Sequence, residues 1–156
     1  MGAKAHALNP SNPSNRKTRA PLPPGPWEQA YRDHWSFAYR LAQALSKGDA
    51  ASARRLAAGA FCEAARQGSS EGAANIAQRW AAACLALANP AAEAMPLLVG
   101  ARALPRQQQA AFLAFDICGI EARQAAAIAG ASAAEFGRLL LQARLALRGA
   151  LRSAAS

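Results

Sequence analysis

Apolar residues recur every three or four positions along most of the chain, which is the spacing of an amphipathic α-helix. From Trp27 onward, this spacing predicts one helix that ends at Lys47-Gly48. The apolar residues on its predicted inner face are Trp27, Ala30, Tyr31, Ala38, Leu41, Ala42 and Leu45. Two more helices are predicted over about 50–66 and 71–88, so the first half of the chain is expected to form three helices.

The second half of the chain shows the same periodicity. It predicts three further helices, over about 106–118, 121–129 and 132–151. Gly130 separates the last two, and Ser132 with Glu135 three residues later has the spacing of a capping box. A helix, a tight glycine-containing turn and a second helix form the helix-turn-helix arrangement.

Composition restricts the fold to helices. The 156 residues include 45 Ala and 17 Leu, but only 4 Ile and a single Val. Ala and Leu are strong helix formers, whereas sheets draw on β-branched residues. We therefore predict an all-α protein in which two small helical bundles are joined by a short connector. Residues 1–26 hold six of the nine prolines and are expected to be a disordered basic tail. The first bundle is assigned to 27–89, the connector to 90–103 and the second bundle to 104–152.

Charge and cysteine content indicate the class of protein. The chain carries 18 Lys and Arg against 9 Asp and Glu, and a formal net charge of +9 favours polyanionic partners such as nucleic acid. It lacks an apolar run of about 18 residues that could span a membrane, and its start lacks the apolar segment of a secretory signal. Cys62, Cys84 and Cys118 are odd in number and widely spaced, which favours neither a disulfide framework nor a zinc site. We expect a cytoplasmic protein without a metal or cofactor.

The predicted helix-turn-helix carries a family pattern. Its matching positions are Leu104-Pro105-Arg106-Gln107, Phe112-Leu113, Gly119-Ile120, Ala126, Ile128, Gly130, Ser132, Phe136, Leu140, Ala143-Arg144 and Leu147-Arg148. Without a gap, these positions resemble region 4 of the extracytoplasmic-function sigma factors, which belong to the sigma-70 family. The resemblance covers about 104–152 and implies a helix-turn-helix that binds promoter DNA.

The first bundle resembles region 2 of the same family more weakly, over about 27–66. The positions that carry this resemblance are Trp27-Glu28, Tyr31, His34-Trp35, Ala53, Leu56 and Phe61. Between about 66 and 103 the resemblance fades, although the family's promoter-melting helix belongs there. Only Asn75, Arg79 and Trp80 offer counterparts to its promoter-contacting residues.

The resemblance assigns candidate DNA contacts to the last helix. They are Arg138, Gln142, Arg144 and Arg148, since arginines bind phosphates and polar side chains read base edges. The alternative is that these four residues form only a solvated face of a basic protein. Other positions of this helix depart from the family pattern. Glu135 is unfavourable near a phosphate, and the run Leu139-Leu140-Leu141 makes the helix apolar on most sides. This run indicates either deeper packing against the first bundle or a protein-binding surface.

A second departure concerns the docking face of region 2. Arg54 and Arg55 stand where the resemblance implies acidic residues that dock on RNA polymerase, and a basic pair would repel a basic partner surface. The candidate partner-binding residues are therefore Arg54, Arg55, Leu139 and Leu141.

Two functions follow from the resemblance. The first is a sigma-factor-like regulator of bacterial transcription initiation that binds promoter DNA, RNA polymerase core or both. The alternative is a sigma mimic that acts by protein contact without DNA, either by sequestering an anti-sigma factor or by adapting another transcription regulator. An enzyme with a small-molecule substrate is not expected, because the chain has two His and lacks a nucleophile motif, a glycine-rich phosphate loop and metal-ligand spacing.

Overall fold

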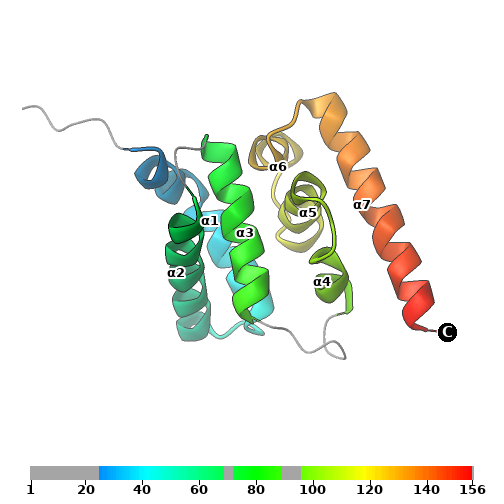
Figure 1. Cartoon of the computed structure of the whole chain (residues 1–156), viewed down its shortest axis with the longest axis horizontal. Helices are drawn as coiled ribbons and strands as arrows, with labels where there is room; N and C mark the ends of the chain where they lie inside the picture. The colour runs from blue at the N-terminus through cyan, green and yellow to red at the C-terminus, as the bar shows by residue number, and fades with distance from the viewer. Residues whose placement is uncertain (1–24, 69–71, 89–95, 156) are drawn as a thin grey trace, which may run out of the picture.

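The computed structural model describes residues 25–68, 72–88 and 96–155, and all regular structure in these ranges is helical (Figure 1). The all-α prediction is therefore confirmed. The elements are α1 (Pro26–Leu45), α2 (Ala50–Gln67), α3 (Ala73–Ala88), α4 (Pro96–Ala101), α5 (Arg106–Phe112), the π-helical turn η1 (Leu113–Ile117), α6 (Ala122–Ala129) and α7 (Ala133–Ala154). The expected disordered tail lies outside the described residues except for its last two positions. No helix in the described ranges is long and apolar enough to cross a membrane.

Local sequence signals account for the helix ends. Pro26 occupies the first turn of α1, where its missing N–H leaves no hydrogen bond unmade. The Asp49 side chain caps α2 by accepting a hydrogen bond from the Ser52 backbone N–H at 2.9 Å. Ser132 and Glu135 form the predicted capping box at the start of α7. The predicted single helix over 106–118 is instead divided, because the chain widens into a π-helical turn after α5.

Helices α1, α2 and α3 pack around a cluster of aromatic rings. Trp80 of α3 lies at its centre with 1% of its surface exposed, and its ring contacts Tyr31, Trp35 and Phe61. The indole N–H of Trp80 donates a hydrogen bond to the Ala57 carbonyl of α2 at 2.8 Å. A buried indole that bonds to a neighbouring helix fixes both the position and the rotation of α3 against α2.

The remaining helices pack on the other side of α3. Figure 1 shows α1 and α2 at one end of the molecule, α4 to α6 in the middle and α7 along the opposite edge. Buried side chains of α3 form one continuous apolar core with those of α5, η1 and α6, including Cys84, Leu85, Leu113 and Ile128. The buried Gln78 side chain also donates from α3 to the Ile128 carbonyl at 3.4 Å.

This shared core bears on the predicted domain organisation. The expected arrangement of two bundles joined only by a connector is not confirmed, because α3 contributes to the packing on both of its sides. Part of the connector is the short helix α4, which lies against α7. At Gly100 of α4, an added Cβ would come within 2.9 Å of Leu147 Cδ2, so the absence of a side chain permits this close approach.

Candidate partner interface on helix α7

Helices α6 and α7 form a tight corner around Gly130. This residue has a φ of +65°, the left-handed conformation that glycine adopts without strain, and its N–H donates to the Ala126 and Ala127 carbonyls at the end of α6. Ile128 of α6 and Phe136 of α7 are buried on the inner side of the corner. The structure therefore has two helices joined at a glycine corner here, and their assignment as a DNA-binding helix-turn-helix stays a prediction.

Carboxylates occupy the start of both helices. The Glu121 Oε1 atom accepts a hydrogen bond from the Arg123 N–H at 3.4 Å at the start of α6. At the start of α7, Glu135 Oε2 accepts from the Ser132 N–H at 2.9 Å and from its hydroxyl at 2.7 Å. These bonds from Ser132 lower the pKa of Glu135, so its charge is retained at neutral pH. A helix N-terminus is a natural phosphate site, and here a negative side chain already lies at each one.

Two of the four predicted DNA contacts bond within the molecule. Arg144 makes a bidentate ion pair with Asp116 of η1, with Nε 3.0 Å from Oδ2 and Nη2 2.6 Å from Oδ1. The Gln142 side-chain oxygen accepts a hydrogen bond from Gln108 of α5 at 3.2 Å. Both residues therefore hold α7 against the rest of the molecule, which opposes their use on a nucleic acid.

The other two predicted contacts, Arg138 and Arg148, are exposed on α7. Within the described part of the chain, neither makes a hydrogen bond or an ion pair. They are three turns apart along the helix, so they do not form a dense basic patch. Affinity for DNA rests on several neighbouring phosphate contacts, and two separated arginines supply few of them.

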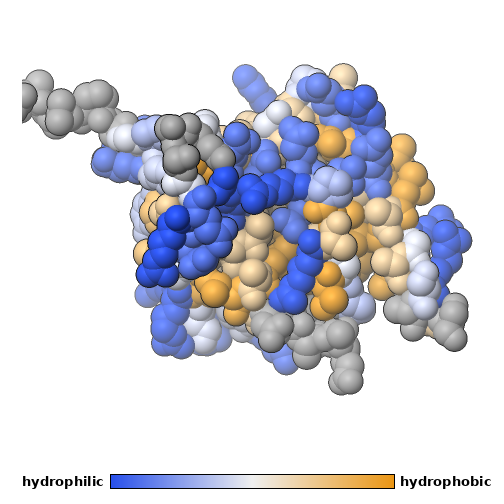
Figure 2. Space-filling model, viewed as in Figure 1, coloured by the Kyte–Doolittle hydropathy of each residue, from blue (hydrophilic) through white to orange (hydrophobic). Residues whose placement is uncertain are grey.

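The three consecutive leucines of α7 have different environments. Leu140 is buried, Leu139 is half-buried against the core, and Leu141 has 58% of its surface exposed. Leu145, one turn after Leu141, is also 58% exposed. Figure 2 shows hydrophobic residues at the middle of the outer edge of the helix that Figure 1 labels α7, with hydrophilic residues on either side. Sequence analysis missed Leu145, although its spacing of four from Leu141 places both on the same helix face.

The predicted partner-binding residues form two separate surfaces. Arg54 and Arg55 are exposed on α2, and the Arg55 guanidinium donates to the Ser52 hydroxyl at 3.2 Å. Helix α2 lies at the opposite end of the molecule from α7 (Figure 1), so these arginines are not combined with Leu139 and Leu141. Of the promoter-contact counterparts in α3, Trp80 is a core residue rather than an exposed one.

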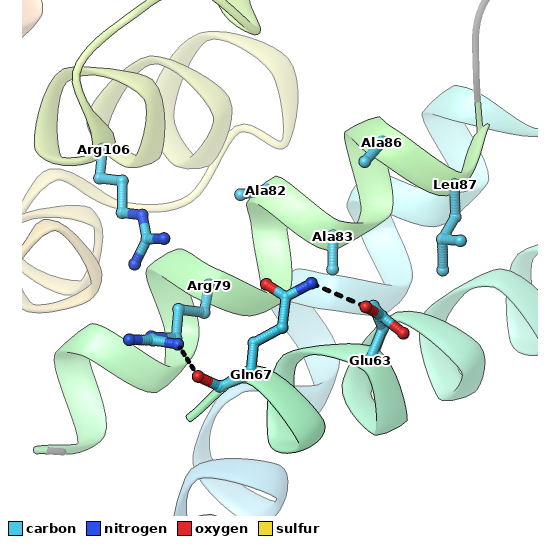
Figure 3. Close-up of a pocket in the computed structure, with 8 residues that line it drawn as sticks. All are labelled: Glu63, Gln67, Arg79, Ala82, Ala83, Ala86, Leu87 and Arg106. Carbon is cyan, nitrogen blue, oxygen red and sulfur yellow. Dashed lines mark hydrogen bonds between the residues drawn. The ribbon is translucent and has the colours of Figure 1, made fainter. Parts of the chain in front are cut away.

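A groove of about 310 Å³ lies between α2, α3 and the start of α5 (Figure 3). Alanines of α3 line one side, and the guanidinium groups of Arg79 and Arg106 extend into the same end of it. Three of its four polar side chains bond to one another or to the backbone: Gln67 Nε2 donates to Glu63 Oε1 at 2.7 Å, and Arg79 donates to the Gln67 carbonyl at 2.8 Å. Among the described residues, no group of three His, Cys, Asp or Glu side chains is arranged to hold a metal ion.

No protein-family model matches the chain, and no curated protein or solved structure is significantly similar to it.

Proposed function

We propose that this protein is a sigma-factor-like regulator of bacterial transcription initiation that acts by contact with another protein. The sequence pattern over 104–152 supports the relationship to sigma factors, and the corner formed by α6, Gly130 and α7 agrees with a helix-turn-helix. The partner class follows from the resemblance: an anti-sigma factor or another transcription regulator.

One observation carries the preference for protein contact over DNA. On α7, Arg144 is bound to Asp116, while Leu141 and Leu145 each have 58% of their surface exposed. A DNA-reading helix presents cations and polar groups to the groove, whereas a protein-binding helix presents apolar side chains with a polar rim. The carboxylates at the starts of α6 and α7 add repulsion against phosphates.

Promoter binding is the second candidate function. The exposed Arg138 and Arg148, together with the formal net charge of +9, favour it. In this case the region around α7 would contact DNA phosphates through these two side chains, and RNA polymerase would be recruited to the same promoter.

The deciding experiment is a pull-down of the tagged full chain from an extract of its own cells, with the partners identified by mass spectrometry. It is followed by run-off transcription with core polymerase. Protein-contact regulation predicts recovery of an anti-sigma factor or another transcription regulator, and no run-off product. Stoichiometric core polymerase together with a run-off product would contradict it and support the promoter-binding function.

A salt titration of DNA binding separates the same two functions. If Arg138 and Arg148 contact phosphates, replacing both by Ala should reduce the slope of log affinity against log salt by about 2, or about one unit per lost contact. Protein contact predicts an unchanged slope. Arg54→Ala with Arg55→Ala, which removes the same charge from α2, is the matched control.

A further inference from the structure

The outer face of α7 carries a strip of four exposed residues: Arg138, Leu141, Leu145 and Arg148. Their spacings of 3, 4 and 3 positions place them on one side of the helix, opposite the buried Leu140 and Leu147. At a rise of 1.5 Å per residue, the two arginines are about 15 Å apart along the axis, with both leucines between them. We call these four residues the α7 strip.

We propose that the α7 strip binds an acidic amphipathic helix of a partner protein. This inference rests on the proposed function and names the chemistry of the partner. A helix that lies along the strip covers the two leucines with its own apolar side chains and places carboxylates against the two guanidiniums. The partner helix therefore carries an acidic residue, apolar residues three and seven positions later, and a second acidic residue ten positions later. This pattern has the same spacing in both chain directions.

Nothing in the described part of the chain obstructs such a helix. Gly137 and Gly149 flank the strip on α7, and an added Cβ at either position would meet no atom within 4 Å. The surface beside the leucines is therefore open, which allows the backbone of a partner helix to approach closely. Arg138 and Arg148 make no hydrogen bond or ion pair in the described ranges, so neither has to break such a bond in order to bind. The charge of Glu135, one turn before Arg138, acts on this arginine without bonding to it.

Repulsion between arginines argues against a second copy of the chain as the preferred partner of the α7 strip. If two α7 helices pack antiparallel about Ala143, Leu141 of one copy meets Leu145 of the other, but Arg138 then lies opposite Arg148. In a parallel pair of α7 helices, each arginine faces the same arginine of the other copy. Like charges across an apolar contact are unfavourable, whereas an acidic helix turns both positions into attractive pairs.

The test uses a labelled synthetic peptide of about 18 residues that carries this pattern on a helix-forming Ala and Gln background. Binding to the full chain is followed by fluorescence anisotropy at about 0.15 M salt, where weak electrostatic attraction is screened. Saturable binding is expected. Replacing the two peptide leucines by Ala should weaken it by at least about tenfold, and so should Leu141→Ala with Leu145→Ala in the protein. The Arg138→Glu, Arg148→Glu variant should not bind the acidic peptide. It should bind a second peptide in which Lys replaces both acidic residues.

Two matched variants serve as controls. Leu87→Ala removes a leucine of α3 that is 52% exposed, and Arg54→Glu reverses an exposed charge of α2; both variants should bind the peptide like the parent chain. All six substituted side chains are exposed, so far-ultraviolet circular dichroism should report unchanged helix content. Equal binding of the alanine peptide would overturn the proposal, because it would show only general attraction to a basic protein.

The pull-down separates this inference from the proposed function. If a transcription regulator is captured equally well by the parent chain and by the Leu141→Ala, Leu145→Ala variant, the proposed function stands. The α7 strip is then not the binding site for that partner. If the peptide binds as expected but the protein partner recovered through the strip has no role in transcription, the α7 strip is a binding site for an acidic helix and the proposed function is wrong.

Discussion

Replacing Trp80 by Phe tests the conclusion that this residue belongs to the core rather than to a promoter-contacting surface. The indole has 1% of its surface exposed, and its N–H donates to the Ala57 carbonyl at 2.8 Å. Losing this hydrogen bond costs about 1 kcal/mol. The smaller ring leaves a void against Tyr31 and Phe61, which costs about 1–2 kcal/mol more. The free energy of unfolding should therefore fall by about 2–3 kcal/mol, and Tm by about 5–10 °C.

Urea titration followed by far-ultraviolet circular dichroism measures this change. Trp27→Phe is the control, because Trp27 is half-buried at the edge of the same ring cluster and should lose less stability. The two variants should capture the same protein partners as the parent chain. The reasoning would be refuted if Trp80→Phe were as stable as the control but lost a partner or DNA affinity, since Trp80 would then act on a functional surface.

Three further predictions concern backbone strain and buried titratable groups. Gly130→Ala should lower stability by about 1–2 kcal/mol in urea titration, because alanine is strained at a φ of +65°. Burial raises the pKa of the Cys84 and Cys118 thiols from 9.0 to about 12, so the unfolded chain loses these protons first and stability should fall as pH rises from 9 towards 12. At pH 8, a thiol reagent should therefore label the exposed Cys62 well before the other two cysteines. Burial lowers the pKa of His34 below its ordinary 6.5 despite the neighbouring Asp33, so stability should fall as pH drops through 6.5, and His34→Gln should remove this dependence.

Helix positions could be predicted from the sequence because their causes are local. The cap of α2 joins Asp49 to Ser52, and the capping box of α7 joins Ser132 to Glu135, so each signal lies within four residues. The glycine at the corner before α7 is equally local, because it depends on one backbone conformation. Such signals gave the start of α2 and the first residues of α7 without knowledge of the tertiary structure.

The roles of the candidate site residues could not be predicted in the same way, because they depend on distant partners. Arg144 fits the pattern of a DNA contact by its sequence position, but Asp116, 28 residues earlier, binds it across the fold. Trp80 is a different case. The spacing of Ile76, Trp80 and Cys84 predicts an apolar face of the third helix, whereas the sigma-factor resemblance places Trp80 among exposed promoter contacts. All three side chains are buried, so the prediction from the spacing is confirmed for Trp80.

The net charge is a weaker sign of nucleic-acid binding than its magnitude suggests, because several arginines have structural partners. The pairs and backbone bonds are Arg32 with Glu28, Arg66 with Glu63, Arg144 with Asp116, Arg79 with the Gln67 carbonyl and Arg102 with the Leu85 carbonyl. The last of these satisfies a carbonyl in the final turn of α3, where helix geometry leaves it unpaired.

The kind of partner that a basic protein binds therefore depends on two conditions. The first is which arginines make no hydrogen bond or ion pair within the protein, and the second is which side chains surround them. Arg138 and Arg148 meet the first condition on α7, and their immediate neighbours on the same face are two exposed leucines. A phosphate backbone gains little from covering leucines, since its outer edge is mostly charged and polar. An amphipathic acidic helix gains from both features at once, because each leucine it covers is removed from water and each carboxylate meets a guanidinium. This difference supports the proposed preference of α7 for a protein partner over DNA.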